Sequence, residues 1–406
     1  MNASTSYPAT GANPLATTLA STLAATVAPR SVATATWFIG VILASAAGIA
    51  VGLLWDISWH MTVGRDSFWT TPHLLEYVSG LAAGLSCGYV VLRTTFAGSD
   101  ADHAVTVRYW GFRGPLGAWI TIWGTFAMLV SAPFDDWWHN AYGLDVKIVS
   151  PPHMVLFLGM LGILLGALAL TASAQNRSAG ERDSLRDAWL YAAAGGVLCL
   201  IFACGTLEYS WPNEQHTGLY YMVWGAVFPL MLVGYSRAGR LRYGAAAAAL
   251  VFMVIWFVMG QALRLVPAVP MLAPLWNART YLWPPYFPVW LVVPALGVDL
   301  VRRHAGERRP WLTSLLAGAA FVLLLCAVQW PMSSFMLTGA SHNWFFNGQE
   351  WPYTTRAGPW QQSFWASERG TTLLSPTFWS LVPGLAATVS SRLGLAWGGW
   401  MSRVRR

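Results

Sequence analysis

The chain has 406 residues, of which 55% are hydrophobic and only 10% are charged, and its mean hydropathy is +0.46. Soluble globular proteins usually carry about 25% charged residues, so the composition excludes a soluble enzyme, a disordered chain and a nucleic-acid-binding module. The net charge of +7 does not indicate nucleic acid, because the basic residues lie in short loops between apolar segments. The sequence therefore predicts an all-α integral membrane protein.

The residues before the first apolar stretch have a simple composition. Residues 1–34 are rich in Ala, Ser and Thr and contain one basic residue, Arg30. They lack the charged start and the compact apolar core of a secretory signal. This composition predicts a mobile N-terminal tail, and a mis-started leader is the alternative.

Ten apolar stretches follow, each of roughly the 20 residues that a helix needs to cross a bilayer. The expected spans are 35–55, 72–93, 115–137, 152–174, 188–209, 217–236, 244–263, 284–302, 311–330 and 373–396. The last span is interrupted by Pro383, Gly384, Ser390, Ser391 and Arg392. About ten transmembrane helices, arranged as successive hairpins, place both termini on one side of the membrane.

The basic residues fall on alternate loops, which sets the expected orientation. Seventeen lie in the tail, after every second span and at the end of the chain: Arg30, Arg93, Arg108, Arg113, Arg177, Arg182, Arg186, Arg237, Arg240, Arg242, Arg302, Arg303, Arg308, Arg309, Arg403, Arg405 and Arg406. The opposite loops hold six: Arg65, Lys147, Arg264, Arg279, Arg356 and Arg369. Cytoplasmic loops are enriched in Lys and Arg, so both termini are expected in the cytoplasm, below a bacterial-type inner membrane.

The opposite loops are rich in acids and imidazoles. Six of the eight histidines lie there: His60, His73, His139, His153, His216 and His342. Ionisable residues beside the hydrocarbon region are unfavourable, which makes them functional candidates. We therefore divide the chain into a six-helix metal-binding region at 35–240 and an additional membrane region at 241–406, whose outer segment at about 331–372 is rich in aromatic residues.

The first candidate metal site combines one carboxylate with two imidazoles. Asp56 and His60 are four residues apart, so they share one helical face if the first span continues through them. His73 opens the next span behind Pro72, a residue suited to a helix start. A tight hairpin brings His73 back to the same level. Three N and O ligands suit Cu(II), Zn(II) or non-haem Fe(II).

The second candidate site repeats this arrangement in the following hairpin. Asp135 and His139 are again four residues apart at the outer end of a span, and His153 follows Pro152 at the start of the returning span. The two patterns are Asp-x3-His-x12-His and Asp-x3-His-x13-His. One Asp-x3-His pair can be a helix-end ion pair, and one histidine near a span end is usually interfacial. Two copies with the same returning histidine favour metal binding.

Several neighbouring polar residues are weaker candidates. Arg65, Asp66 and Asp136 could orient the imidazoles, as residues around metal ligands do, although a solvent-exposed ion pair explains Arg65 and Asp66 equally well. A third hairpin carries Glu208 and His216 without the same spacing. It is either a satellite polar cluster or an interfacial one.

The first pattern resembles a known signature. The run is Asp56-x-Ser58-Trp59-His60-x4-Arg65-Asp66-x5-Pro72-His73. It is similar to the copper-binding motif of the C-type subunit of the particulate methane, ammonia and hydrocarbon monooxygenases. The resemblance implies that Asp56, His60 and His73 bind copper within the membrane region.

The same C-type subunit has a neighbouring copper site with the pattern Asn-x3-His-x13-His, which Asp135, His139 and His153 resemble. This chain has Asp where the family has Asn, and an anionic ligand is expected to hold Cu(II) more tightly. The specific resemblance covers about residues 50–160. The family member is shorter and works with A-type and B-type subunits, and no part of this chain resembles the cupredoxin-like region of the B-type subunit.

The resemblance implies a copper-binding membrane protein with one or two copper ions that takes part in oxidising a small apolar substrate or ammonia with O2. It also implies A-like and B-like partner subunits and a trimeric assembly in the lipid bilayer. A copper-binding or delivery protein without oxygenase activity is the first alternative. A cation transporter is the second, which the position of the ligands at span ends rather than mid-membrane disfavours.

Overall fold

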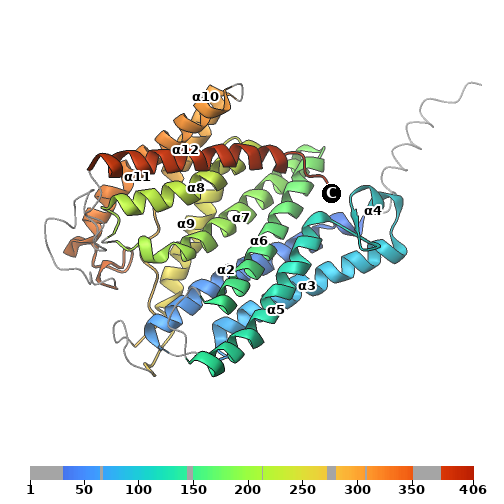
Figure 1. Cartoon of the computed structure of the whole chain (residues 1–406), viewed down its shortest axis with the longest axis horizontal. Helices are drawn as coiled ribbons and strands as arrows, with labels where there is room; N and C mark the ends of the chain where they lie inside the picture. Colours follow the sequence, from blue (N-terminus) through green and yellow to red (C-terminus); the bar gives the residue numbers. More distant parts are fainter. Residues whose placement is uncertain are drawn as a thin grey trace, which may run out of the picture.

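The structure is a computed structural model, which describes residues 31–64, 67–143, 150–212, 214–271, 280–306, 309–350 and 376–406. These residues form eleven α-helices, four short 3-10 helices and one two-stranded sheet (Figure 1). The described residues are therefore mainly helical, as the composition predicts.

Eight helices are long and apolar enough to cross a membrane. They are α2 (Thr36–Thr62), α3 (Thr71–Ala97), α5 (Leu116–Tyr142), α6 (Pro151–Arg177), α7 (Glu181–Gly205), α8 (Gly218–Ala238), α9 (Gly244–Leu263) and α11 (Pro310–Met336). The remaining helices are η1 (Val32–Thr34), α4 (Asp100–Ala104), η2 (Leu207–Tyr209), α10 (Val292–Ala305), η3 (Gly339–Ser341), η4 (Gly348–Glu350) and α12 (Pro376–Met401). Each of the eight overlaps an expected span, which confirms a multi-pass, all-α membrane protein.

Of the other two expected spans, one is partly non-helical and the other is a helix that is not among these eight. The stretch expected at 284–302 is non-helical up to residue 291, and α10, of 14 residues, follows it. Pro284, Pro285 and Pro288 explain the difference, because proline lacks the backbone N–H and clashes with the preceding helical turn. Protein covers this segment, as the buried Tyr286 and Val289 show. Burial in protein is the condition under which non-helical backbone is tolerated at membrane depth.

The stretch expected at 373–396 is helical, but α12 is not among the eight span helices. It packs along α8, and glycines allow the close approach. A Cβ at Gly394 would lie 2.5 Å from the Leu230 carbonyl oxygen, and a Cβ at Gly225 would lie 2.9 Å from the Pro383 carbonyl oxygen. Ser390 Oγ also accepts a hydrogen bond from the Leu230 N–H. Ser390, which interrupts the apolar pattern, and Gly394 thus form part of the contact with α8.

A short β-hairpin connects α4 to α5. Strands β1 (Val107–Tyr109) and β2 (Phe112–Gly114) pair antiparallel. The Thr94 hydroxyl at the end of α3 donates to the Arg113 carbonyl, and the Thr95 hydroxyl accepts from the Arg113 N–H. Nearby, Ser31 donates to Asp102 at 2.6 Å. Asp102 therefore connects α4, to which it belongs, with the segment before α2.

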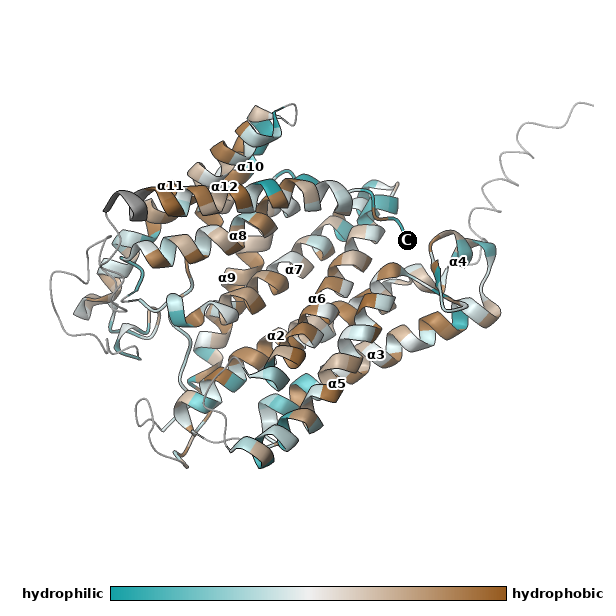
Figure 2. Cartoon of the chain, viewed as in Figure 1, coloured by the Kyte–Doolittle hydropathy of each residue, from teal (hydrophilic) through white to brown (hydrophobic). Residues whose placement is uncertain are grey.

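The arginine-rich loops lie together at one end of the bundle. Arg240 contacts Ser178 and Ser184 between α6 and α7, and the Arg177 guanidinium reaches the backbone of Arg405 after α12. The ends of α2 and α5, which carry the Asp-x3-His pairs, lie at the opposite end (Figure 1). Figure 2 shows hydrophobic residues along the long helices and hydrophilic ones gathered at these ends.

Candidate metal centre

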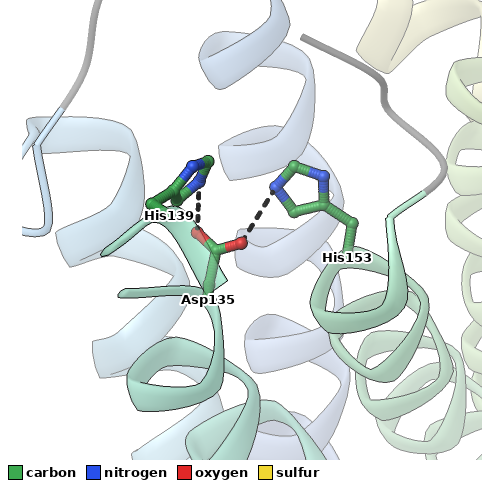
Figure 3. Close-up of side chains that lie close together, drawn as sticks. All are labelled: Asp135, His139 and His153. Atoms are coloured by element: carbon green, nitrogen blue, oxygen red, sulfur yellow. Dashed lines mark ion pairs between the residues drawn. The ribbon is translucent and has the colours of Figure 1, made fainter. Parts of the chain in front are cut away.

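The second predicted trio comes together at the end of the α5–α6 hairpin. His139 Nε2 lies 3.3 Å from Asp135 Oδ2, and His153 Nε2 lies 3.5 Å from Asp135 Oδ1. The carboxylate thus stands between the two rings, one oxygen towards each (Figure 3). One ligand atom from each residue lies within 4.8 Å of the other two, a spacing that one ion can bridge.

Local sequence places these three side chains. Helix α5 runs through Pro133 to Tyr142, so Asp135 and His139 lie one turn apart on its last turns. Ser150 caps α6 by accepting a hydrogen bond from the His153 backbone N–H at 3.4 Å. His153 is therefore fixed in the first turn of α6, opposite the last turns of α5.

The first predicted trio has the same arrangement. His60 Nε2 lies 3.6 Å from Asp56 Oδ2, and His73 Nε2 lies 3.3 Å from Asp56 Oδ1. Helix α2 continues through His60 to Thr62, so Asp56 and His60 do share one face. The returning histidine approaches Oδ1 in both trios, and the i+4 histidine approaches Oδ2. The predicted repeat in sequence is thus also a repeat in the contacts between each carboxylate and its two histidines, although only the Asp135 trio has all three ligand atoms within 4.8 Å of one another.

The hydrogen bonds of the rings indicate which nitrogens face the carboxylates. His73 Nδ1 lies 3.0 Å from the Ser67 carbonyl oxygen, and His139 Nδ1 lies 3.4 Å from the Gly143 carbonyl oxygen. A carbonyl only accepts, so Nδ1 carries the proton and a neutral ring turns the lone pair of Nε2 to the carboxylate. A lone pair facing an anionic oxygen requires a cation between them or a second proton on the ring.

The carboxylate oxygens fit a metal for the same reason. Asp56 Oδ1 and Asp135 Oδ1 are buried and accept no hydrogen bond, and a buried carboxylate without such bonds is unfavourable unless a cation compensates it. Two imidazoles and one carboxylate are also a donor set that Cu(II) and Zn(II) accept. The Asp135 trio therefore fits a divalent ion as it stands. The Asp56 trio offers the same donors, but its three ligand atoms do not all lie within 4.8 Å of one another.

The two trios differ in what lies one turn further along the returning helix. In α3 this residue is Glu76, which is 3% exposed and whose Oε1 accepts no hydrogen bond. It occupies the space beside Gly52, where a Cβ would lie 2.6 Å from Glu76 Cγ. In α6 the corresponding residue is Leu156, packed against the apolar core. Sequence analysis missed Glu76, although an acid inside an apolar span is itself a signal of function.

Two of four weaker candidates, Asp136 and Glu208, lie within the described residues. Arg65 and Asp66 lie outside the described residues. Asp136 is exposed, and its carboxylate accepts a hydrogen bond from Asn140 one turn later, at 3.3 Å. Glu208 is exposed on η2. The position of Asp136 thus shows contact with Asn140 rather than with an imidazole.

His216 is instead a buried structural residue. Its Nε2 lies 3.2 Å from the Trp330 carbonyl oxygen and 2.9 Å from Ser334 Oγ, and its ring packs edge-on to Trp330. Burial lowers the pKa of His216, and the hydrogen bond to Trp330 partly opposes this shift. His216 therefore links the α7–α8 loop to α11.

The chain was compared with known proteins. No protein family, no curated protein and no solved structure matches it. The resemblance to the C-type monooxygenase subunit therefore rests on the two ligand patterns, and their geometry is the basis for a function.

Proposed function

We propose that this chain is a copper-binding membrane protein that takes part in a membrane copper monooxygenase. The observation that carries the proposal is the convergence of Asp135, His139 and His153 with ligand atoms within 4.8 Å of one another. The Asp56 trio repeats the arrangement, so we expect one or two copper ions per chain. Zinc and iron accept the same donors, and metal analysis distinguishes them.

The protein's own residues hold and orient the ion. In each hairpin one carboxylate and two Nε2 atoms supply three ligands, while the Nδ1 hydrogen bonds of His73 and His139 fix their ring orientation. Three protein ligands leave a position open, as catalytic metal sites require. Copper, when bound, would supply the redox chemistry that activates O2.

The surroundings suit a small apolar substrate. Apolar helix surfaces around both hairpins face outward, among them Leu74, Val78, Val130 and Leu158. A short alkane dissolves in lipid and could approach along these surfaces, and ammonia is small enough for the same site. The outward-facing apolar residues thus support entry of the substrate from the bilayer.

The proposed orientation follows from the two ends of the bundle. The arginine-rich end would face the cytoplasm with both termini, by the positive-inside rule. The trios would then face the periplasmic side of a bacterial-type inner membrane. A-like and B-like subunits and a trimeric assembly are the partners that the resemblance suggests.

A copper-delivery function without oxygen chemistry is the second candidate. The side chains of the Asp135 trio are 27–35% exposed, and that of His60 is 48% exposed. Partly exposed ligands allow an ion to be passed to another protein. Copper binding at these sites is therefore compatible with copper delivery as well as with oxygen chemistry, and the two activities need separate tests.

Metal content tests the binding sites. The chain purified from membranes is analysed for copper, zinc and iron, and we expect one to two copper ions. His139→Ala with His153→Ala should remove one ion, and His60→Ala with His73→Ala the other. His304→Ala with His342→Ala is the matched control, because both histidines are exposed and outside the trios. Unchanged metal content in both trio variants would reject the assignment.

Oxygen uptake separates the two functions. Membranes that contain the chain and any partner subunits are supplied with duroquinol, and oxygen consumption is measured with short alkanes and with ammonia. Substrate-dependent uptake that the His139→Ala variant loses supports the monooxygenase. Full copper loading without substrate-dependent uptake supports copper delivery.

A further inference from the structure

A basic pocket lies at the arginine-rich end of the bundle, between the start of α5 and the segment after α12. Its volume is about 400 Å³, and it is lined by Leu116, Trp400, Arg403, Val404, Arg405 and Arg406. Half of these residues are arginines, and no aspartate or glutamate is among them. The pocket thus combines positive charge with an apolar wall of Leu116, Trp400 and Val404.

The backbone of the pocket is held in place. The Asn176 side chain donates to the carbonyl oxygens of Met401 and Val404, both at 2.8 Å, and Arg177 donates to the Arg405 carbonyl oxygen at 2.7 Å. Met401 and Val404 are buried in the core. The segment after α12 is therefore fixed to the end of α6, and the pocket is a built feature of the fold.

The arginines of the pocket differ from three others at this end that are held by hydrogen bonds. Arg177, Arg240 and Arg302 donate hydrogen bonds to neighbouring loops and helices. The guanidinium groups of Arg403, Arg405 and Arg406 are exposed, and none makes an ion pair with the described residues. Three neighbouring positive charges repel one another, so an anion in the pocket would be stabilised.

The β-hairpin next to the pocket indicates its depth in the membrane. Trp110 at the hairpin tip is 71% exposed and has a φ of +49°, which is uncommon for a bulky residue. It stacks on Tyr109 at 4.9 Å, and exposed Trp and Tyr side chains are typical of the membrane–water interface. β2 ends at Gly114, two residues before Leu116 of the pocket, so we infer that the pocket lies at the headgroup level.

The same hairpin adds positive charge. Arg108 and Arg113 lie directly opposite each other in the β1–β2 register. Like charges in this position are unfavourable, and an anionic surface beside the hairpin would relieve the repulsion. This second arginine group points to the same kind of partner as the pocket.

We propose that the pocket binds the phosphodiester headgroup of an anionic phospholipid. Arg403, Arg405 and Arg406 would hold the phosphate, because guanidinium groups match its geometry. Leu116 and Trp400 would contact the first part of the acyl chains. A basic pocket beside membrane helices on the arginine-rich side is suited to such a lipid. This inference does not depend on the metal sites.

Lipid binding is measured on the full chain in detergent by native mass spectrometry and by thermal unfolding. The probes are phosphatidylglycerol, phosphatidylcholine and inorganic phosphate. We expect phosphatidylglycerol to bind and to raise the unfolding temperature, and phosphatidylcholine to do neither. Arg403→Gln with Arg405→Gln should weaken the binding of phosphatidylglycerol roughly 10- to 30-fold, at about 1 kcal/mol for each arginine.

The matched control is Arg182→Gln with Arg309→Gln, which removes two exposed arginines from the same end but outside the pocket. This control should bind phosphatidylglycerol as the unaltered chain does. Equal losses in the two double variants, or equal binding of both phospholipids, would overturn the proposal. Stabilisation by inorganic phosphate alone, equal to that by phosphatidylglycerol, would also overturn it, since the ligand would then be a soluble anion.

Discussion

The α2–α3 and α5–α6 hairpins each end in one aspartate and two histidines but are held together differently. Helices α5 and α6 touch backbone to backbone, and a Cβ at Gly159 would lie 2.5 Å from the Met128 nitrogen. Helices α2 and α3 meet through side chains, with Glu76 filling the space beside Gly52. The comparison shows that two helical hairpins can bring one aspartate and two histidines together whether their helices pack through backbone atoms or through side chains.

Loss of the carboxylate charge should have the largest effect. Asp56→Asn and Asp135→Asn each remove the only anionic ligand of a trio, and we expect Cu(II) affinity to fall on the order of 100-fold. The fall should be greater for Asp56, which is 17% exposed against 32% for Asp135, since water compensates the more exposed site. Copper titration of the two variants checks this order.

An unchanged Cu(II) affinity in both Asn variants would mean that the two carboxylates only form ion pairs with protonated histidines. A drop in one variant alone would show that the hairpins, despite their matching geometry, have different functions.

Packing is the next difference to test. Gly159→Ala places a methyl group against the α5 backbone, which has no room to move, so the chain should lose about 2 kcal/mol of stability. Gly52→Ala meets only the flexible Glu76 side chain and should lose less. Thermal unfolding in detergent measures both variants. Gly40→Ala is the control, since no atom lies within 4 Å of its Cβ position.

If Gly52→Ala were as destabilising as Gly159→Ala, the proposed difference in packing between the hairpins would be wrong. Copper content of the Gly159→Ala variant adds a second readout, because separation of α5 from α6 also moves His153 away from Asp135.

Exchanging the residues beneath the trios should have a smaller effect. Glu76→Leu removes a buried carboxyl without a hydrogen bond and should stabilise the chain by about 1–2 kcal/mol. Leu156→Glu introduces such a group into α6 and should destabilise the chain by a similar amount. Unfolding temperatures test the pair, and Glu76→Gln is the control that keeps the size of the side chain. A stability loss in Glu76→Leu would show that the carboxyl has a favourable partner.

The smallest expected effect is a pH dependence of stability that comes from His216 in the loop between α7 and α8. Burial lowers the pKa of His216 below its value in the unfolded chain. At a pH between these two pKa values, the unfolded chain therefore binds more protons than the folded chain. The stability of the metal-free protein should therefore be full above about pH 6.5 and decrease as the pH falls below it. His216→Gln should flatten this dependence in a series of thermal unfolding curves. An equally steep dependence in the variant would assign it to another group.

The sequence could predict that each aspartate lies close to two histidines, because helical spacing determines these contacts. Asp56 and His60 had to share a face once α2 was long enough, and Pro72 and Pro152 mark where the returning helices begin. The spacing of the histidines gives no sign of Glu76, and the burial of this acid depends on the gap that Gly52 leaves in another helix.

The span count was less predictable, because hydropathy does not measure backbone conformation. Residues 284–302 are apolar enough to suggest a helix, yet three prolines keep their first part non-helical. The pocket at Arg403 was also not predictable, since it depends on the contact of Asn176 with a segment 225 residues later.

The pairing of α8 with α12 also affects the order of assembly. The Leu230 and Ser390 groups that hydrogen-bond to each other are 160 residues apart, so α8 enters the bilayer well before its partner is synthesised. Until then the face of α8 that carries Gly225 and Gly234 and later contacts α12 must be covered by lipid or by an insertion factor. Completion of this fold is therefore a late event in biosynthesis, and a fusion that delays α12 would leave an otherwise inserted chain open to membrane proteases.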